Sequence, residues 1–340
     1  MAQPAGVPTV TIPLDSDATT ITVGERHVGL TNLGKIFFTE AGLTKRDLLQ
    51  YYADVARLLL PHLRERAMVM KRYPHGAAGD FFFMKRTPPG APAWLQTCSI
   101  EHGSGSIIAF PIVDDLSALL WIINLGCIDL NQWYARCDDV GRPDYLHFDL
   151  DPVKDDELGA TAFETVCTAA LALRSALGEI GLPAYAKTSG SNGIHLYVPI
   201  ARGPLQHDVW RFAKAFAFAV AGRHPDILTA EYKIAKRPKN RVLVDYNQNA
   251  WGRTLASVYS VRPTPRASVS TPVTWEEIER GFAIADFRVD NVRARFAKTG
   301  DLWAPLVARD GRFDLASLLE SEPQPVRKRT TARSSKGASP

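Results

Sequence analysis

Cysteine and long apolar runs are both scarce in this chain. Its 340 residues include four cysteines, and no CxxC motif or other paired spacing occurs among Cys98, Cys127, Cys137 and Cys167. This scarcity disfavours a structural zinc site and favours a reduced, cytoplasmic protein. The longest apolar runs, such as Ala118 to Gly126, are far too short to span a bilayer. Because the N-terminus also lacks a basic segment followed by an apolar one, we expect neither a signal peptide nor a membrane partner.

A large excess of charge is missing too. The formal net charge is only +4, and the composition, 46% hydrophobic and 22% charged, is that of an ordinary globular protein. The distribution of charge is more informative, because basic residues gather in Lys233 to Arg241 and in Arg327 to Arg329. Either cluster alone can equally be a solvated loop. From about residue 322 onward Pro, Ser, Thr, Lys and Arg dominate, so we expect one domain over residues 1–321 and a basic, disordered tail over 322–340.

The order of hydrophobic patterns predicts an α+β fold. Alternation over residues 8–29, around Asp15-Ser16-Asp17, predicts a β-hairpin. Helical spacing that starts at Leu43-Thr44 predicts a helix that ends at Pro61. Further strands are expected at 68–70, 107–110, 146–150, 194–199 and 242–244, and further helices at 116–125, 162–180, 209–221 and 275–282. These elements do not alternate as in a doubly wound sheet, so sheets and helices should be mixed.

Three carboxylates are candidates for metal ligands. Asp149 and Asp151 lie in one predicted strand, and because strand side chains alternate, both point to the same face. Asp245 ends a separate apolar run, from which a third carboxylate can reach the same site. Nucleotidyl transfer needs two divalent cations roughly 3.5–4 Å apart, and such ions need hard oxygen ligands. An Asp-x-Asp pair by itself is weak support, since surface strands often contain one.

The segment from Lys187 to His195 is a candidate phosphate site. It contains Ser189, Gly190, Asn192 and Gly193, and a turn of such residues exposes backbone N–H groups that can bind phosphate oxygens. Lys187 adds a positive charge, and His195 can donate a hydrogen bond from the strand that follows. Taken alone, the segment is also compatible with an ordinary β-turn that happens to precede a histidine.

Taken together, these segments resemble the signature motifs of the archaeo-eukaryotic primase superfamily, and most closely the polymerase domain of bacterial DNA ligase D. The three motifs are Phe148-Asp-x-Asp-Pro152, Lys187-Thr-Ser-Gly-x-x-Gly-x-His195 and Val244-Asp-Tyr-Asn-Gln-Asn249. The likeness extends over roughly residues 20–290, with further matches at 30–45, 71–74, 80–85, 259–262 and 269–275. It implies an RRM-like catalytic core with mixed or antiparallel sheets flanked by helices.

The resemblance also implies a role for each candidate residue. The ligands of catalytic Mn²⁺ or Mg²⁺ would be Asp149, Asp151 and Asp245. The residues that would bind the incoming nucleotide are Lys71, Phe82, Phe83, Lys187, Ser189, His195 and Arg262. Phe82 and Phe83 would stack on bases. The alternative for these two is core packing, which is the commoner role of aromatic residues. Lys35 and Lys45 match positions that bind the downstream 5′-phosphate of a gap or break.

The implied activity is that of a template-directed polymerase, a nucleotidyltransferase that fills short gaps or extends ends in DNA break or excision repair. Ribonucleoside triphosphates would be the preferred substrates, and non-homologous end joining in a bacterial nucleoid the setting. De novo primase activity and a non-catalytic scaffold on DNA ends are the alternatives.

Two departures from the resemblance qualify these expectations. Where relatives often carry a histidine before the next tryptophan, this chain reads Asn131-Gln-Trp133, which puts template-strand contacts there in question. No ligase or nuclease segment follows the polymerase segment. We therefore expect a stand-alone enzyme whose partners are gapped or broken DNA, a separate ATP-dependent DNA ligase and an end-binding protein.

Overall fold

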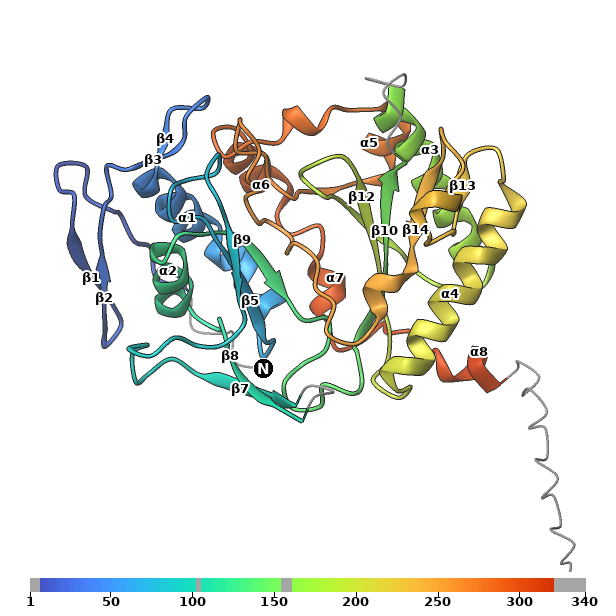
Figure 1. Cartoon of the computed structure of the whole chain (residues 1–340), viewed down its shortest axis with the longest axis horizontal. Helices are drawn as coiled ribbons and strands as arrows, with labels where there is room; N and C mark the ends of the chain where they lie inside the picture. The colour runs from blue at the N-terminus through green and yellow to red at the C-terminus, as the bar shows by residue number, and fades with distance from the viewer. Residues whose placement is uncertain (1–6, 102–104, 154–160, 321–340) are drawn as a thin grey trace, which may run out of the picture.

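A computed structural model describes residues 7–101, 105–153 and 161–320, and no helix in these ranges is long and apolar enough to cross a membrane. Its centre is a six-stranded sheet of order β13-β14-β10-β12-β11-β15 (Figure 1). All neighbours are antiparallel except β13 and β14. The bounds are β10 Tyr145–Pro152, β11 Tyr185–Thr188, β12 Ile194–Pro199, β13 Leu228–Thr229, β14 Val242–Asp245 and β15 Pro272–Val273. The predicted mixed α+β fold is therefore confirmed.

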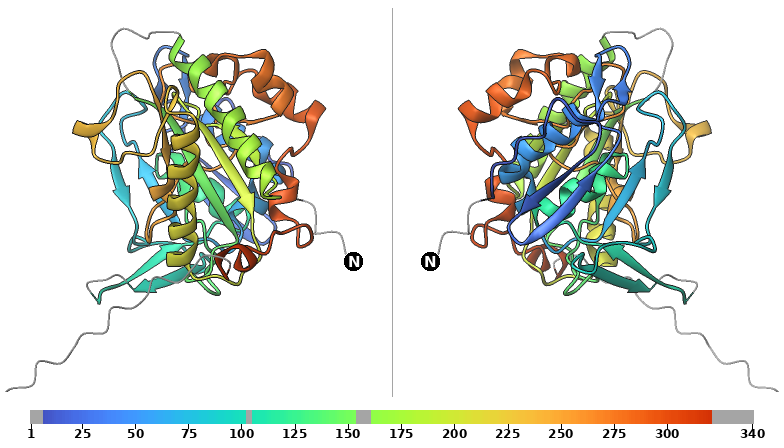
Figure 2. Two further views of the ribbon diagram at one scale, coloured as in Figure 1. Left: turned by 90° about the vertical axis from the view of Figure 1, so that its right-hand side faces the viewer. Right: turned by 90° about the vertical axis from the view of Figure 1, so that its left-hand side faces the viewer.

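Two helices complete the core motif. Helix α3 (Thr161–Glu179) follows β10, and helix α4 (Gln206–Arg223) follows β12. Apart from the two-residue strand β13, which precedes β14, the chain runs β10-α3-β11-β12-α4-β14, and these strands lie in the order β14-β10-β12-β11. This βαββαβ arrangement is that of a split βαβ, RRM-like sheet. The two helices pack on one face of it, as a view from the side shows (Figure 2).

The alternation of strand β10 separates the core from the site. Leu146, Phe148 and Leu150 are fully buried, and Phe148 packs against Phe216 of α4 with ring centroids 5.2 Å apart. The intervening residues, His147, Asp149 and Asp151, must point to the opposite face, which the helices leave free. The apolar positions of β10 thereby fix the orientation of the two carboxylates.

A smaller sheet, of order β6-β5-β9, lies beside the first one in the N-terminal half (Figure 1). Its strands are β5 Met68–Arg72, β6 Phe82–Met84 and β9 Cys127–Gln132. Helix α1 (Lys45–Leu63) begins at Thr44, whose side chain forms a capping box with Asp47. The remaining elements of this half are β1 Thr19–Val23, β2 Arg26–Leu30, β3 Ile36–Phe38, β4 Leu43–Thr44, β7 Thr97–Glu101, β8 Ile107–Pro111 and α2 Leu116–Asn124.

The short helices of the C-terminal segment are α5 Trp275–Arg280, α6 Val292–Thr299, α7 Ala304–Val307 and α8 Ala316–Glu320. Helix α5 packs against α3, and α7 packs against β12. The 3₁₀ turns are η1 Ile234–Lys236 and η2 Tyr246–Asn249, before β15, and η3 Ile284–Asp286, after it. The predicted start of α5 is confirmed, because Thr274 and Glu277 form a capping box. The predicted basic tail lies outside the described residues.

The position of the first hairpin and the end of α1 differ from the prediction. The hairpin spans Thr19–Leu30 and turns at Gly24, whose φ of 60° suits glycine, instead of turning at Asp15–Asp17. The segment before it forms no strand, because Ile12 binds the side chain of Gln50 on α1 through its backbone N–H. Pro61 does not end α1, which continues to Leu63.

The expectation of reduced, unpaired cysteines was wrong for two of the four. Cys98 on β7 and Cys137 after β9 form a disulfide, with Cα atoms 5.8 Å apart. Cys127 and Cys167 are free and buried. The pairing joins positions separated by 39 residues, and it depends on how β7 packs near the end of β9. Spacing along the chain therefore could not reveal it.

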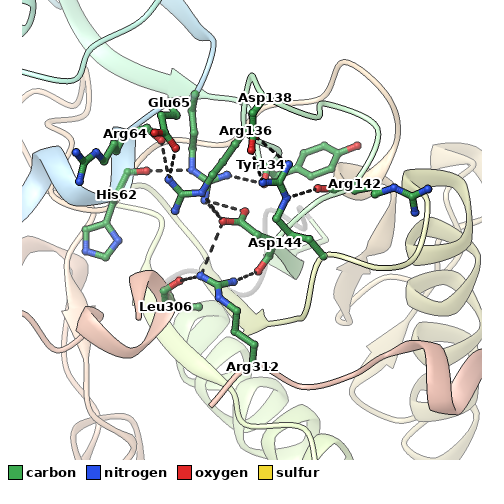
Figure 3. A network of polar contacts seen from close by, with 12 residues as sticks. His62, Arg64, Glu65, Tyr134, Arg136, Asp138, Arg142, Asp144, Leu306 and Arg312 are labelled. Carbon is green, nitrogen blue, oxygen red and sulfur yellow. Dashed lines mark hydrogen bonds and ion pairs between the residues drawn. The ribbon is translucent and has the colours of Figure 1, made fainter. Parts of the chain in front are cut away.

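A buried carboxylate joins distant parts of the chain (Figure 3). Asp144, which precedes β10, accepts from Arg66 at 2.8 Å and from Arg136 at 2.9 Å, while Arg312 lies 3.9 Å away. Burial alone would raise the pKa of Asp144, but the guanidinium groups of Arg66 and Arg136 outweigh it and lower the pKa. This network stabilises the start of the strand that carries Asp149 and Asp151.

Candidate active site

Four polar side chains form a row across neighbouring strands of the central sheet. Asp149 on β10 pairs with Asp245 on β14 and with His195 on β12. His195 in turn pairs with Lys187 on β11. Directly opposed residues lie on the same face with Cβ atoms about 4.5–5.5 Å apart. The structure therefore brings together residues from three separate sequence motifs, as the sequence predicted.

Asp151 lies on the same strand face, beside a glycine that the sequence did not single out for packing. A Cβ on Gly193 would lie 2.3 Å from the carbonyl oxygen of Leu150 and 2.7 Å from Oδ1 of Asp151. Backbone atoms cannot move away cheaply, so only glycine allows β12 to approach β10 so closely here. Gly193 thus belongs to the architecture of the site.

We expect Gly193→Ala to displace β10 at Asp151, with a loss of about 1–3 kcal/mol of stability from overpacking and a large loss of any activity that depends on Asp151. Gly203→Ala is the matched control, because nothing lies within 4 Å of a Cβ there. Chemical denaturation of both variants measures the effect. Equal stability of the two would contradict the proposed close approach.

The three carboxylates repel one another. Burial raises the pKa of Asp149 to about 6. The neighbouring Asp149 charge, followed by burial, raises the pKa of Asp151 to about 7. Burial and then Asp149 also raise the pKa of Asp245. A site in which carboxylates resist ionisation attracts positive charge, either protons or metal cations.

Lys187, the member of this row on β11, does not reach the surface. It is completely buried, and its ammonium donates to Oγ of Ser270 at 2.6 Å and contacts Nδ1 of His195 at 2.8 Å. With Lys187 as the donor, Nδ1 of His195 accepts and Nε2 carries the proton, 3.2 Å from Oδ1 of Asp149. Burial, then the Lys187 charge, lowers the pKa of His195. Lys187 therefore orients His195 and is itself covered by the surrounding residues.

The turn that contains Ser189 is closed on itself. The Ser189 hydroxyl accepts from the backbone N–H groups of Ser191 at 3.1 Å and Gly193 at 2.9 Å. Gly190 has a φ of 71°, and a Cβ there would lie 2.5 Å from the Arg262 side chain. Two of the N–H groups expected to bind phosphate are thus already engaged. The turn instead places Gly190 directly against Arg262.

Lys71 and Arg262 meet at a carboxylate that sequence reasoning missed. Lys71 on β5 lies 3.6 Å from Oδ2 of Asp129 on β9, and Nη1 of Arg262 lies 3.5 Å from Oδ1. Asp129 is almost fully buried. The sequence feature that could have indicated Asp129 is an acidic residue within a strand, β9, that is buried along its whole length. The Asn131 side chain donates to the backbone oxygen of Asp129 at 3.1 Å.

The phenylalanines of β6 are on the surface. Phe82 and Phe83 are 43% and 58% exposed, so core packing does not explain them. Phe83 pairs with Lys71 across the sheet, while Phe82 pairs with Arg72 and lies 5.2 Å from its guanidinium. Neighbouring strand residues point to opposite faces. Of these two, Phe83 therefore shares the face of Lys71, whose ammonium also lies 4.1 Å from the ring centroid of exposed Phe81.

Lys35 and Lys45 lie side by side at the start of α1, away from β10. The backbone N–H of Lys45 donates to the carbonyl of Lys35 at 2.8 Å. The Lys35 ammonium is exposed and bonds the Pro74 carbonyl at 2.7 Å, whereas Lys45 is nearly buried and bonds the Thr31 carbonyl at 2.6 Å. Burial, followed by the Lys35 charge, lowers the pKa of Lys45 to about 8.

The sequence and the structure were then compared with known proteins. The family described as "LigD, primase-polymerase domain" matches residues 44–303. The chain is 33% identical, over 83% of its length, to the multifunctional non-homologous end joining protein LigD of Mycolicibacterium smegmatis, and 32% identical, over 79%, to the bifunctional LigD of Bacillus subtilis. It spans only 36% and 42% of these relatives.

A solved structure gives the same result. It is the "Polymerase Domain from Mycobacterium tuberculosis Ligase D in complex with DNA", with a TM-score of 0.76 and 30% sequence identity. The match covers 82% of this chain and 98% of that one. The resemblance stated from the motifs is confirmed. The chain belongs to the LigD primase-polymerase domain family and is a nucleotidyltransferase.

Proposed function

We propose that this chain is a template-directed polymerase that fills short gaps or extends ends during DNA break repair, with a preference for ribonucleotides. The observation that carries the proposal is the cross-strand row of Asp245, Asp149 and His195, with Asp151 two residues along the same face. A cluster of mutually repelling carboxylates beside a proton-bearing imidazole fits the transfer of a nucleotide from a triphosphate. The relatives' names, which specify end joining, support the repair setting.

The donor set fits divalent cations. Oδ1 of Asp149 is buried and has no aligned hydrogen-bond partner among the described residues, and the neighbouring carboxylates resist ionisation. Asp149, Asp151 and Asp245 would hold the ions, Mn²⁺ or Mg²⁺. When bound, two such ions would stabilise the attacking and leaving oxygens. In the described residues no three His, Cys, Asp or Glu side chains already form a closed metal site, so ligation by all three requires side-chain rotation.

The remaining residues would bind and orient the nucleotide. His195, held by Lys187, presents its Nε2–H on the face of the carboxylates. Lys71 and Arg262 place two positive charges across from that row, suited to the triphosphate. Phe83, exposed on the face of Lys71, is placed to stack on a base, which is typically worth about 1–3 kcal/mol. Ser189 shapes the turn that carries Gly190 against Arg262.

A gap-filling assay tests the function. The substrate is 5′-phosphorylated gapped DNA, with ribo- or deoxyribonucleoside triphosphates and Mn²⁺ or Mg²⁺. We expect templated incorporation that ends when the metal is chelated. Products on an unprimed single strand would indicate primase activity instead. DNA binding without incorporation under every condition would leave only the scaffold alternative, in which the basic residues bind DNA ends and the three carboxylates are vestigial.

Lys35 and Lys45 should make nucleotide incorporation faster on gaps that carry a 5′-phosphate than on gaps that lack one. We expect Lys35→Ala with Lys45→Ala to reduce the preference for phosphorylated over unphosphorylated gaps about tenfold, because charge-assisted hydrogen bonds to phosphate are worth about 1.5–3 kcal/mol. Lys35→Ala alone is the cleaner variant, since Lys35 is exposed and Lys45 is nearly buried. The ratio of incorporation rates on the two substrates measures it.

Lys298→Ala with Arg309→Ala removes the same charge from exposed positions elsewhere and should leave that ratio unchanged. Because Lys45 has a pKa of about 8, the benefit should also decline as the pH rises from 7 to 9. If the lysine variants lose the same fraction of the incorporation rate on phosphorylated and unphosphorylated gaps, the lysines do not bind the 5′-phosphate.

A further inference from the structure

The meeting of Lys71 and Arg262 at Asp129 is the polar contact that links the two halves of the site. Lys71 belongs to the small sheet, and Arg262 follows the η2 turn after the central sheet. Their side chains are 17% and 20% exposed, whereas that of Asp129 is 2% exposed. The two cations therefore reach the open side of the site, and the carboxylate lies behind them.

Asp129 has little else to bind. Its Oδ1 has no hydrogen-bond partner among the described residues, and its two cationic neighbours lie at 3.5 and 3.6 Å, beyond ordinary hydrogen-bond length. A buried carboxylate with an unpartnered oxygen is costly unless nearby charges compensate it. The cations, in turn, keep N–H groups free for a further acceptor.

Without Asp129, the arrangement of the two cations would not hold. Arg262 and Lys71 repel each other, which lowers the pKa of Lys71 in addition to the larger effect of burial, while Asp129 raises it. The Arg262 charge also opposes the rise in the pKa values of Asp149 and Asp151, so it lies close enough to interact with both carboxylates. Removal of the Asp129 charge would therefore let Arg262 turn toward those carboxylates and separate from Lys71.

We propose that Asp129 is a positioning residue that holds Lys71 and Arg262 together as a two-cation clamp for the triphosphate of the incoming nucleotide. The inference rests on the proposed function, because it assigns the ligand of the same site. Asp129 does not touch the nucleotide. It acts by holding Lys71 of the small sheet beside Arg262 of the segment between η2 and β15, and by keeping Arg262 apart from Asp149 and Asp151.

The test is Asp129→Asn, which keeps the shape and removes the charge. We expect the KM for the nucleotide to rise about tenfold, with kcat changed less than threefold and the Kd for gapped DNA unchanged. The Kd of a ribonucleoside triphosphate with a non-hydrolysable α–β linkage, measured by calorimetry, should rise by the same factor. In the Lys71→Met background, Asp129→Asn should raise the nucleotide Kd by a factor at least threefold smaller than in the wild type, because the effects of coupled residues are not additive.

Asp144→Asn is the matched control. It also removes a buried carboxylate that binds arginines (Figure 3), so it should lower thermal stability without a selective effect on nucleotide KM. If Asp129→Asn does not fold, Asp129→Glu, which keeps the charge and moves it by one methylene, replaces it and should raise KM about threefold. An unchanged nucleotide Kd, or fully additive effects with Lys71→Met, overturns the clamp.

The two proposals can fail separately. If the wild-type protein binds the triphosphate but incorporates none, the proposed function fails, and the clamp is still judged by the Kd values. If the wild type incorporates nucleotides and Asp129→Asn binds them normally, only the clamp fails. If the wild type binds no triphosphate, both are overturned.

Discussion

Replacement of Asp149 and Asp151 together by alanine should abolish nucleotide incorporation, with a loss of about 10⁴-fold or more, as for other groups that act as a unit in catalysis. The physical reason is that these two carboxylates share one strand face and would supply the oxygen ligands common to both cations. A gap-filling time course with saturating Mn²⁺ measures the loss. The Kd for gapped DNA should not rise, because the variant removes negative charge that would repel the DNA phosphates.

A control must remove the same charge elsewhere. Asp290→Ala with Asp310→Ala does so at two exposed positions and should retain wild-type incorporation. Single Asp149→Asn and Asp151→Asn variants preserve the side-chain shape and should each lose nearly as much activity as the double variant. Normal incorporation by the double variant would rule out the assignment of the catalytic site.

Asp151→Asn should make the metal-free protein more stable at pH 8, by on the order of 2 kcal/mol, about half of the full conversion of 1.36 kcal/mol per pKa unit, because Asp151 is exposed and solvent screens the repulsion. The pKa of Asp151 is raised from 3.8 to about 7, chiefly by the Asp149 charge. Between these values the folded protein binds more protons than the unfolded chain, so its stability falls as the pH rises. The neutral amide removes this repulsion. Thermal denaturation with a chelator present, at pH 4 and pH 8, measures the difference.

The sign of the effect reverses when metal is added. A cation that binds the folded state at a hundredfold excess over its Kd stabilises it by about 2.7 kcal/mol, so Mn²⁺ should raise the Tm of the wild type and raise that of Asp151→Asn much less. At pH 4 the metal-free proteins should be equally stable. A variant that is less stable than the wild type at pH 8 without metal would mean that the carboxylates are held by contacts other than those seen here.

These two predictions share one cause. A site with several like charges close together lowers the stability of the folded protein, and a bound ligand of opposite charge restores that stability. Asp149 and Asp151 therefore reduce stability in the metal-free protein and would supply function in the loaded one. The Asp144 network, in which three arginines surround one carboxylate at the start of β10, offsets part of this by stabilising the same strand.

Local patterns predicted much of the secondary structure, and only long-range packing explains the errors. The capping boxes at Thr44 and Thr274 were predictable because a cap involves residues three positions apart. The first hairpin was placed too early because both candidate turns are locally acceptable, and packing of Ile12 beside Gln50 decided between them. The Cys98–Cys137 pair had no local signal.

The sequence by itself determined that Asp149 and Asp151 share a face, because strand alternation is a property of consecutive residues, and it determined the family through three ordered motifs. Only the tertiary structure decided that Asp245 and His195 flank Asp149, that Lys187 is buried behind His195, and that Asp129 joins Lys71 to Arg262. Each of these depends on the register between strands or the meeting of two sheets. That register is set by burial of apolar faces over the whole molecule, which no short segment contains.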